Sequence, residues 1–435
     1  MTNQHTNAMK QTRNIKNSLL LFFLFFLGGV NAQVIINEYS CSNMNGITDN
    51  YGENEDWIEL LNTTGADIDL TGFYLSDKSS NLLKWQIPGA TIPANGYQVV
   101  MCSRRNTVIG GQLHPNFNLK QTQNEWIILS NTLGNVIDSI KIVHMTKMDH
   151  SVGRSTDSAP DWKLFTTPTP GAPNVGAQNF YEPKPTMSVA PGFYPGAQDV
   201  SLSCADPAAT IRYTTDGSYP TPTSTAYSGP INISTTTVLR ATAFGADAPS
   251  FTESNTYFIN ENHGVCVVSV YSDDVYDLVA NGNQGGFGGS ANKVGGFELF
   301  EQDGTFIDEG DGHFNKHGND SWAYAQRGFD FIMRDQFGYN DDIDHQLFPA
   351  DTPREDFQRI MLKPGASDNY PFENGGAHIR DAFVHTLSIR ADMLLDERTW
   401  RPAVVYLNGQ YWGVYEIREK ADDHDYTEYY YDQDK

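Results

Sequence analysis

Short runs of alternating apolar residues, separated by Gly, Asn, Asp and Pro, fill the first part of the chain. Between Gln33 and Asn174 they read VIINEYS, EDWIELLNTT, GFYLSD, KWQIP, YQVVMC, EWIILSN and NVIDSIKIV. A period of two is typical of strands with one buried face. At 435 residues the chain is also too long for one hydrophobic core. The sequence therefore predicts several domains, of which the first, residues 33–174, is an all-β, immunoglobulin-like sandwich.

The motifs INEYS, EDWIELLNTTGADIDLTGFYLSD and IPANGYQVV of this segment resemble the lamin tail domain. That resemblance implies an accessory module of an exported protein and no catalytic set. Three acidic residues here, Glu38, Asp56 and Glu59, could form a carboxylate cluster for Ca²⁺. Because no D-x-D-x-D-G loop accompanies them, we favour charges on a solvated strand face.

A second β module is predicted over residues 185–260. The stretch before it, TPTPGAPNVGAQNFYEPKP, is rich in Pro and Gly, which predicts a semi-rigid linker over residues 175–184. The motifs IRYTTDGSYPTPTS and YSGPI resemble the small β-sandwich at the C-terminus of chitobiase and β-hexosaminidase. In that family the module accompanies a separate catalytic domain. Tyr213, Tyr219 and Tyr227 could form a sugar-stacking face or be ordinary aromatics at the edge of a sandwich.

The third segment, residues 261–435, mixes strands with a helix. VCVVSVY predicts a buried strand, and FELFEQDG, GFDFIMRDQFG and FQRIMLKPG predict further strands. In GAHIRDAFVHTLSIRADML, apolar residues at helical spacing predict an amphipathic helix that includes Ile379, Ala382, Phe383 and Leu387. The run VVYLNGQYWGVYEIREK predicts a β-hairpin that turns at Asn408-Gly409. These elements make an α+β lobe.

Three blocks of this segment resemble the spore coat protein H (CotH) kinase family: HGNDSWAYAQRGFDFIMRDQFG, FQRIMLKPGASDN and YLNGQYWGVYEIREK. The resemblance implies a kinase-like fold, of which residues 261–435 are the N-terminal lobe. It also implies ATP and Mg²⁺ as cofactors and phosphoryl transfer to Ser or Thr of extracellular or surface proteins. The chain departs from the family at Gln326-Arg327-Gly328, where lysines and a serine are usual.

Five residues are candidates for holding the nucleotide. Phosphoryl transfer needs a cation on the phosphates, and Arg327, Arg334 and Lys363 could supply it. Asp381 and Glu419 are the candidate carboxylates, and Glu419 matches the terminal glutamate of the family signature. For the basic residues the alternative is a solvent-facing charge on a strand or loop. For Glu419 it is a structural salt bridge with Arg418 or Lys420.

The catalytic residues are not assigned. In a kinase-like fold the catalytic and Mg²⁺-binding aspartates follow the hinge after the closing hairpin. No segment like H-R-D or D-F-G occurs before Lys435, so we expect these residues beyond Lys435 and an incomplete kinase-like lobe in this chain. The glycine-rich run NGNQGGFGG lacks the G-x-G-x-x-G spacing and is a weak candidate for a phosphate-binding loop.

A second functional hypothesis belongs to another class of protein. The two β-sandwiches could bind glycans or a cell-wall polymer in a cell-surface adhesion protein without catalytic activity. Nucleic acid is an unlikely class of partner, because the formal net charge is −24 and repels phosphate backbones.

The N-terminus indicates export. Lys10, Arg13 and Lys16 precede the apolar run SLLLFFLFFL, and small residues follow it up to Ala32. This order predicts a signal peptide over residues 1–32 that is cleaved after Ala32, and a secreted chain without a transmembrane segment. A retained N-terminal anchor is the alternative.

Four cysteines lie far apart without C-x-x-C spacing, which disfavours a zinc or redox site. If a disulfide forms, Cys41 with Cys102 is the favoured pair, because both lie in the first domain. Cys204 and Cys266 are expected to be small buried residues.

Overall fold

The computed structural model describes residues 33–281, 292–318, 322, 324–339, 341–365, 368, 376–393, 395–421 and 423–433. The predicted signal peptide and all but the first residue of the glycine-rich run NGNQGGFGG lie outside these residues. Within them the chain is built mostly of β-strands, and no helix of this part is long and apolar enough to cross a membrane.

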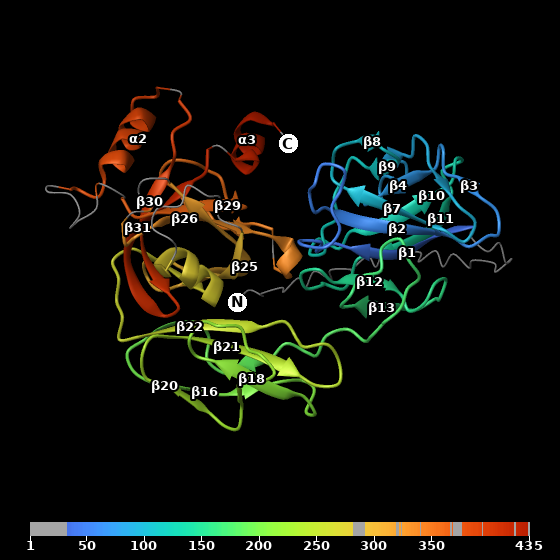
Figure 1. Cartoon of the computed structure of the whole chain (residues 1–435). Coiled ribbons are helices and arrows are strands. Elements are labelled where there is room, and N and C mark those ends of the chain that lie inside the picture. The colour runs from blue at the N-terminus through green and yellow to red at the C-terminus, as the bar shows by residue number, and fades with distance from the viewer. Residues whose placement is uncertain are drawn as a thin grey trace, which may run out of the picture. The chain divides into compact units, whose positions relative to one another are not determined.

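Two sheets with a shared core form the first region (Figure 1). One sheet has the order β13-β12-β1-β2-β7-β9-β8 and the other β11-β10-β4-β5, with a short β3–β6 pair beside them. Residues such as Ile36, Leu60 and Leu129 from both sheets fill the space between them. The predicted all-β sandwich is confirmed. Its strands are β1 (Val34–Ser40), β2 (Asp56–Asn62), β3 (Ile68–Asp69), β4 (Tyr74–Ser76), β5 (Trp85–Gln86), β6 (Thr91–Ile92), β7 (Tyr97–Cys102), β8 (Thr107–Ile109), β9 (Gln112–His114), β10 (Trp126–Ser130), β11 (Val136–Lys141), β12 (Ser151–Arg154) and β13 (Trp162–Phe165).

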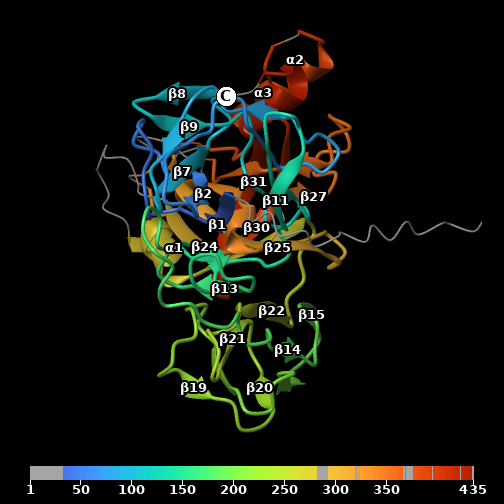
Figure 2. The same cartoon turned by 90° about the vertical axis from the view of Figure 1, so that its right-hand side faces the viewer.

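The second region is also all-β, as predicted. A five-stranded sheet, β15-β22-β21-β18-β19, packs with the pairs β14–β17 and β16–β20 around Val200, Ile233, Leu239 and Tyr257. Figure 2 shows β14 and β20 beside β21 and β22. The strands are β14 (Thr186–Met187), β15 (Gly192–Tyr194), β16 (Gln198–Val200), β17 (Leu202–Ser203), β18 (Thr210–Thr214), β19 (Thr225–Ala226), β20 (Ile231–Ile233), β21 (Thr237–Phe244) and β22 (Glu253–Ile259).

A closed seven-stranded barrel, β23-β24-β25-β26-β29-β31-β30, forms the third region. Its strands are β23 (Cys266–Tyr271), β24 (Lys293–Phe300), β25 (Phe306–His317), β26 (Gly328–Met333), β29 (Arg359–Lys363), β30 (Trp400–Leu407) and β31 (Gln410–Glu419), and a separate pair is formed by β27 (Ile343–Asp344) and β28 (Asp356–Phe357). The helical elements are α1 (Asp273–Tyr276), the π-turn η1 (Asp277–Asn281), the 3₁₀ turn η3 (Asp335–Phe337), α2 (Arg380–Arg390) and α3 (His424–Tyr431). In both views α2 and α3 lie outside the barrel (Figures 1 and 2).

The closing hairpin is confirmed. Strands β30 and β31 pair as antiparallel neighbours, and Asn408 and Gly409 turn the chain with φ of 50° and 77°. Both angles lie in the left-handed region that a two-residue type I′ turn requires and that Asn and Gly tolerate best. The predicted strands at VCVVSVY, GFDFIM and RIMLK also form, as β23, β26 and β29.

The helix α2 forms where predicted, but its apolar side does not pack as an amphipathic helix should. Ile379, Phe383 and Leu387 are about half exposed, and Ala382 is the buried residue of the described helix. On the same face, Thr386 accepts a hydrogen bond of 2.8 Å from Trp400 Nε1 of β30.

All four cysteines are free thiols. Strand β2 lies between β1 and β7. Cys102 is the last residue of β7 and pairs with Asp56 on β2. Cys41 follows β1 directly, so two strand spacings, about 10 Å, separate it from Cys102, beyond the reach of a disulfide. The favoured pair is therefore not formed. Cys266 is buried as expected, whereas Cys204 is only partly buried.

Candidate functional site

The end of strand β29 and the first turn of helix α2 bring Lys363 and Asp381 together. Lys363 is the last residue of β29, and its backbone pairs with Glu416 on β31. Since Ile360 and Leu362 point into the barrel core, alternation turns Lys363 to the outer face. There its Nζ donates to Asp381 Oδ2. The Lys363 side chain keeps 21% of its surface exposed.

Helix α2 is positioned by Asp368, which lies before it. Its carboxylate accepts hydrogen bonds from the backbone N–H of Ala377 at 2.9 Å and of Arg380 at 3.0 Å. The contact with Arg380 satisfies a donor in the first turn of the helix that has no partner within the helix, and the contact with Ala377 holds the segment before it. Asp381 thus lies in the first turn, where a carboxylate is also favoured by the helix dipole.

A second cation contacts Asp381. Arg418 on β31 is fully buried, and its Nη1 lies 2.5 Å from Asp381 Oδ2. Its Nε and Nη2 both donate to Glu416 Oε2, at 2.9 Å and 2.5 Å. Partial burial raises the pKa of Asp381, but the hydrogen bond from Lys363 and the charge of Arg418 outweigh it and lower that pKa to about 2. Asp381 is therefore a fixed anion that holds the Lys363 ammonium.

His385 completes this group. It lies one turn after Asp381 on α2, with its Nε2 3.8 Å from Asp381 Oδ1. Burial lowers the pKa of His385, so its ring is neutral at pH 7. The Lys363 ammonium donates one hydrogen bond to the Asp381 carboxylate and has two further N–H donors for an anionic ligand. The arrangement is chemically suited to holding a phosphate.

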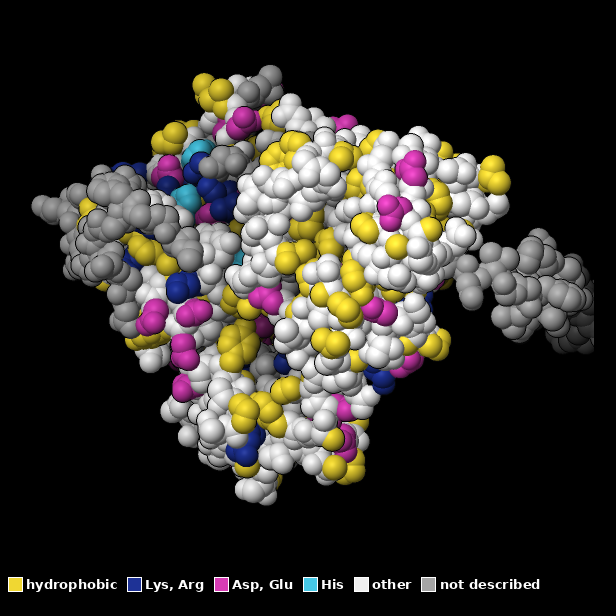
Figure 3. All heavy atoms as spheres, turned by 45° about the vertical axis from the view of Figure 1, so that its right-hand side comes forward, with side chains coloured by type: hydrophobic (Ala, Val, Ile, Leu, Met, Phe, Trp, Pro, Cys, Tyr) yellow, Lys and Arg dark blue, Asp and Glu magenta, His cyan; other side chains and the backbone are white. Residues whose placement is uncertain are grey.

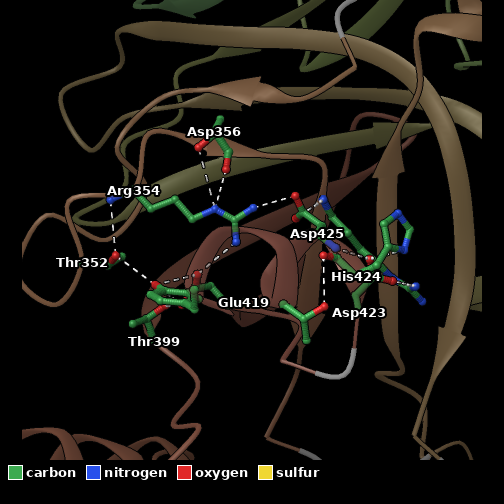
Figure 4. A network of polar contacts seen from close by, with 11 residues as sticks. Thr352, Arg354, Asp356, Thr399, Glu419, Asp423, His424 and Asp425 are labelled. Atoms are coloured by element: carbon green, nitrogen blue, oxygen red, sulfur yellow. Dashed lines mark hydrogen bonds and ion pairs between the residues drawn. The ribbon is translucent and has the colours of Figure 1, made fainter. Parts of the chain in front are cut away.

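Glu419 belongs to a different, buried network (Figure 4). Its carboxylate accepts from Thr399 Oγ1 at 2.5 Å, from Tyr430 Oη at 3.2 Å and from Arg354 Nη1 at 3.4 Å. Arg354 in turn donates to Asp425 of α3 at 2.6 Å. Burial raises the pKa of Glu419. Because Glu419 pairs with Ile360 and Lys363 with Glu416, three residues or about 10 Å of strand separate the two.

Neither candidate arginine joins the pair. Arg327 is only 1% exposed, and its Nη1 lies 3.4 Å from the backbone oxygens of Leu278 and Val279, with the guanidinium over the Trp322 ring. The alternative of a solvent-facing charge is therefore wrong for Arg327. Burial lowers its pKa.

Arg334 lies at the other end of β26, directly before η3. The Arg334 side chain is half-buried. Burial lowers its pKa, and the nearby negative charge of Asp423 offsets only part of this effect. The neighbouring Asp335 accepts from the backbone N–H of Gln121 at 2.9 Å, and Gln121 Nε2 donates to Asp335 O at 2.7 Å. Of the five predicted residues, the structure brings together Lys363 and Asp381 alone.

The sequence analysis missed Arg418 and Glu416 as partners of the pair. A usable signal was present in the run YEIREK, because residues two apart on a strand share a face. Glu416 and Arg418 therefore point the same way, towards Asp381. The alternation of residues in the sequence does not predict that β31 lies next to β29.

The carboxylates considered for Ca²⁺ are not on a solvated face, so that expectation is wrong. Glu38, Asp56 and Glu59 are at most 5% exposed, because β1 and β2 are central strands covered on both sides. Glu59 accepts from Asn37 Nδ2 at 2.9 Å and from Gly171 N at 2.6 Å. Glu38 and Glu59 hold the segment that follows β13, through the backbone N–H groups of Thr169 and Gly171, and Asp56 accepts from Leu119 N at 3.1 Å.

Another acidic group lies in the loop after β1. One ligand atom each of Asp49, Glu53 and Glu55 lies within 4.8 Å of the others. The chain already supplies a cation there, since Arg105 forms an ion pair with Glu53 and its Nε lies 4.0 Å from Asp49.

The three tyrosines considered for sugar stacking are engaged within the protein. Tyr213 and Tyr227 pack against the core of the second sandwich. Tyr219 is 36% exposed, but the Arg240 guanidinium lies 3.6 Å from its ring centroid and its hydroxyl donates to Asp311 at 2.9 Å.

Three regions of the chain match models of known families. Residues 29–144 match the lamin tail domain, residues 189–255 the chitobiase/beta-hexosaminidase C-terminal domain, and residues 315–435 the CotH kinase protein. No curated protein matches the chain. The predicted combination of these three modules is confirmed. The CotH match includes both Lys363 and Asp381.

Proposed function

We propose that this chain is part of an exported CotH-like protein kinase, in which the barrel binds ATP with Mg²⁺ through Lys363. The full protein would transfer the γ-phosphoryl group to Ser or Thr of extracytoplasmic proteins. The observation that carries this proposal is the ion pair of Lys363 with Asp381, within a region that matches the CotH kinase model.

The order of the elements supports this role. In protein kinases a lysine on a strand contacts the nucleotide phosphates and is held by a carboxylate on the following helix. Here the lysine strand β29 is followed by α2 with its carboxylate and then by the hairpin β30–β31, whose second strand pairs with β29. This order supports a kinase-like N-terminal lobe, in which an aspartate would stand in the place of the usual glutamate.

Lys363 fits a phosphate group better than Arg327 does. It is partly exposed and oriented by Asp381, whereas Arg327 is enclosed in the barrel. Bound Mg²⁺ would neutralise phosphate charge during transfer. Asp381 is occupied by Lys363 and Arg418, so its role in the proposal is to position the lysine.

Nucleotide binding tests the proposal. A fluorescent ATP analogue with Mg²⁺ is titrated into the whole chain and into Lys363→Ala. Loss of a hydrogen bond to a charged group costs about 1.5–3 kcal/mol, so binding should weaken about 10- to 140-fold. Lys293→Ala, on a barrel strand outside the pair, is the matched control and should bind as the parent does. Equal affinity in parent and Lys363→Ala would refute the role of Lys363.

Phosphoryl transfer is measured separately, with γ-labelled ATP and mixed Ser/Thr protein acceptors, in the protein as its gene encodes it. Absence of both nucleotide binding and transfer would refute the kinase function. Export is checked by sequencing the N-terminus of the protein recovered from the medium, where a start at Gln33 is expected.

Carbohydrate binding is the second candidate function, and the match of residues 189–255 to a domain of glycan-degrading enzymes favours it. An open hollow of about 390 Å³ in the first sandwich, lined by Lys84, Gln86, Asn106, Thr107 and Asn116, offers polar groups as well. Retention of the whole chain on chitin or cell-wall polysaccharide would support it, and lack of retention on every polymer would count against it.

A further inference from the structure

The second sandwich and the barrel share a hydrophobic cluster. Phe258 of β22 is fully buried, with its ring centroid 5.2 Å from that of Phe300 on β24 and 4.8 Å from that of Tyr406 on β30. Phe193 of β15 stacks on Phe258 with 4.4 Å between ring centroids, and its centroid lies 5.8 Å from that of Phe300. Val267 and Val404 of the barrel complete the cluster. A barrel without the sandwich would expose these apolar side chains to water.

Buried polar contacts lie beside this cluster. Glu298 on β24 is fully buried and accepts from the backbone N–H of Thr256 on β22 at 3.1 Å as well as from its hydroxyl. The Thr256 hydroxyl also lies 2.8 Å from Ser269 Oγ of β23. A buried carboxylate is costly to leave without donors, so the barrel depends on the sandwich at this point.

The loop that carries the chitobiase-like motif is the next contact. Arg240 of β21 is fully buried, stacks on Tyr219 and lies 3.6 Å from Asp311 of β25. The Tyr219 hydroxyl donates to the same carboxylate. The ring centroid of the barrel residue Tyr271 lies 5.0 Å from the Arg240 guanidinium carbon. One carboxylate of the barrel thus holds two residues of the sandwich.

The turn of the closing hairpin meets the same loop. Gly217 has a φ of 82°, and a Cβ added there would lie 2.5 Å from Asn408 Oδ1. Asn408 Oδ1 also accepts from the backbone N–H of Ser272 at 3.0 Å. The motif D-G-S-Y therefore uses its glycine for a close approach to the barrel, which explains why a larger residue does not fit.

From these contacts we propose that the second sandwich is a fixed clamp on the barrel, and that its motif loop Asp216–Tyr219 is a docking element for strand β25 and the hairpin turn instead of a sugar-binding loop. The partner of this surface is the chain's own barrel. Interfaces between domains permit motion unless they are hydrophobic and extensive. This one combines an aromatic cluster with buried charged groups. The inference stands whether or not the barrel binds nucleotide.

Hydrogen exchange in the whole chain tests the clamp. Tyr219→Phe removes the hydroxyl that donates to Asp311, and Asp311→Ala removes the acceptor of that hydrogen bond together with the charge that faces Arg240. A lost hydrogen bond of about 1 kcal/mol corresponds to about fivefold faster exchange through local opening. Tyr219→Phe, made in the sandwich, should speed exchange in barrel peptides 306–317. Asp311→Ala, made in the barrel, should speed exchange in sandwich peptides 237–244. The double variant should add nothing to the larger single effect.

Tyr227→Phe is the matched control, because Tyr227 packs against the core of its own sandwich. It should leave barrel exchange unchanged. The clamp would be refuted if each variant changed exchange only in its own region. The fold-change in exchange rate of the double variant would then equal the product of the fold-changes of the two single variants. Loss of polysaccharide retention in Tyr219→Ala with unchanged barrel exchange would also overturn the proposal, since the loop would then be a sugar site.

Discussion

At the scale of single residues, buried ionisable groups are the main departure from expectation. Glu59 lies opposite Glu38 across strands β1 and β2, with neither exposed. Burial raises the pKa of Glu59 from its ordinary value of 4.5 to about 8, because its charged form loses hydration, although Asn37 and Gly171 donate to it. Such a group links stability to pH.

Glu59 should make the protein less stable as the pH rises. Between about pH 4.5 and 8 the folded state keeps a proton that the unfolded chain has lost, so the free energy of unfolding falls over this window. Glu59→Gln should make the plot of the free energy of unfolding against pH less steep. The change corresponds to at most one proton, or about 1.4 kcal/mol per pH unit. Urea unfolding at four pH values measures it. Asp69→Asn, at an exposed position, should keep the parent slope, and an unchanged slope in Glu59→Gln would contradict the assignment.

Arg354 is expected to be the most sensitive basic residue of the barrel region. It is 2% exposed and pairs with both Glu419 and Asp425. Arg354→Ala leaves both carboxylates without their cation and should cost about 3–5 kcal/mol in the free energy of unfolding. Arg104→Ala, whose exposed group lies 3.9 Å from Glu428, should cost less than about 1 kcal/mol. Urea unfolding compares the two, and similar costs would show that the network is not stabilising.

At the scale of elements, Asn408 stabilises the closing hairpin in two ways that can be tested separately. Its backbone adopts the turn, and its side chain accepts from Ser272 N. Asn408→Gly keeps the turn and loses the acceptor, at a cost of about 1–3 kcal/mol. Asn408→Ala should cost about 1–2 kcal/mol more, because alanine resists positive φ. The unfolding midpoints of the two variants separate the cost of the lost acceptor from the cost of the positive φ. Equal midpoints would mean that alanine does not strain the turn.

Helix α2 is an element whose pattern and packing disagree. Leu387 fits the helical apolar spacing but is 51% exposed. Leu387→Gln should therefore change the free energy of unfolding by less than about 0.5 kcal/mol, as surface substitutions do. Leu362→Gln, in the barrel core, is the contrasting variant and should be strongly destabilising. A cost above about 2 kcal/mol for Leu387→Gln would mean that the apolar side of α2 is packed in solution.

At the scale of the whole molecule, net charge is the dominant electrostatic property. The formal charge is −24, and on the face drawn in Figure 3 the Lys and Arg side chains gather mainly in one group beside His side chains. Long-range repulsion should therefore prevent binding to nucleic acid or heparin at about 0.15 M salt, where the Debye length is about 8 Å. Passage over a heparin column measures this. Retention that falls with added salt would contradict it.

Much of the fold was predictable because its signals are local. Period-two alternation identified the strands of the first sandwich, whereas the second was predicted from its resemblance to a known module. Asn408-Gly409 identified the closing turn, since turn geometry depends on the φ preferences of two residues. The three family resemblances rested on contiguous motifs and were confirmed. The individual candidates Lys363 and Asp381 were also found from such motifs.

What the sequence by itself determined is therefore the elements, the modules and the residue types available for a site. The tertiary structure alone decided which of them meet: Lys363 with Asp381 and Arg418, Glu419 with Arg354 across 65 residues of chain, and Tyr219 with Asp311. It also decided that Glu59 is buried. These pairings depend on which strands are neighbours in the closed barrel and which faces are covered. That is set by packing between distant segments, and no local pattern of the sequence records it.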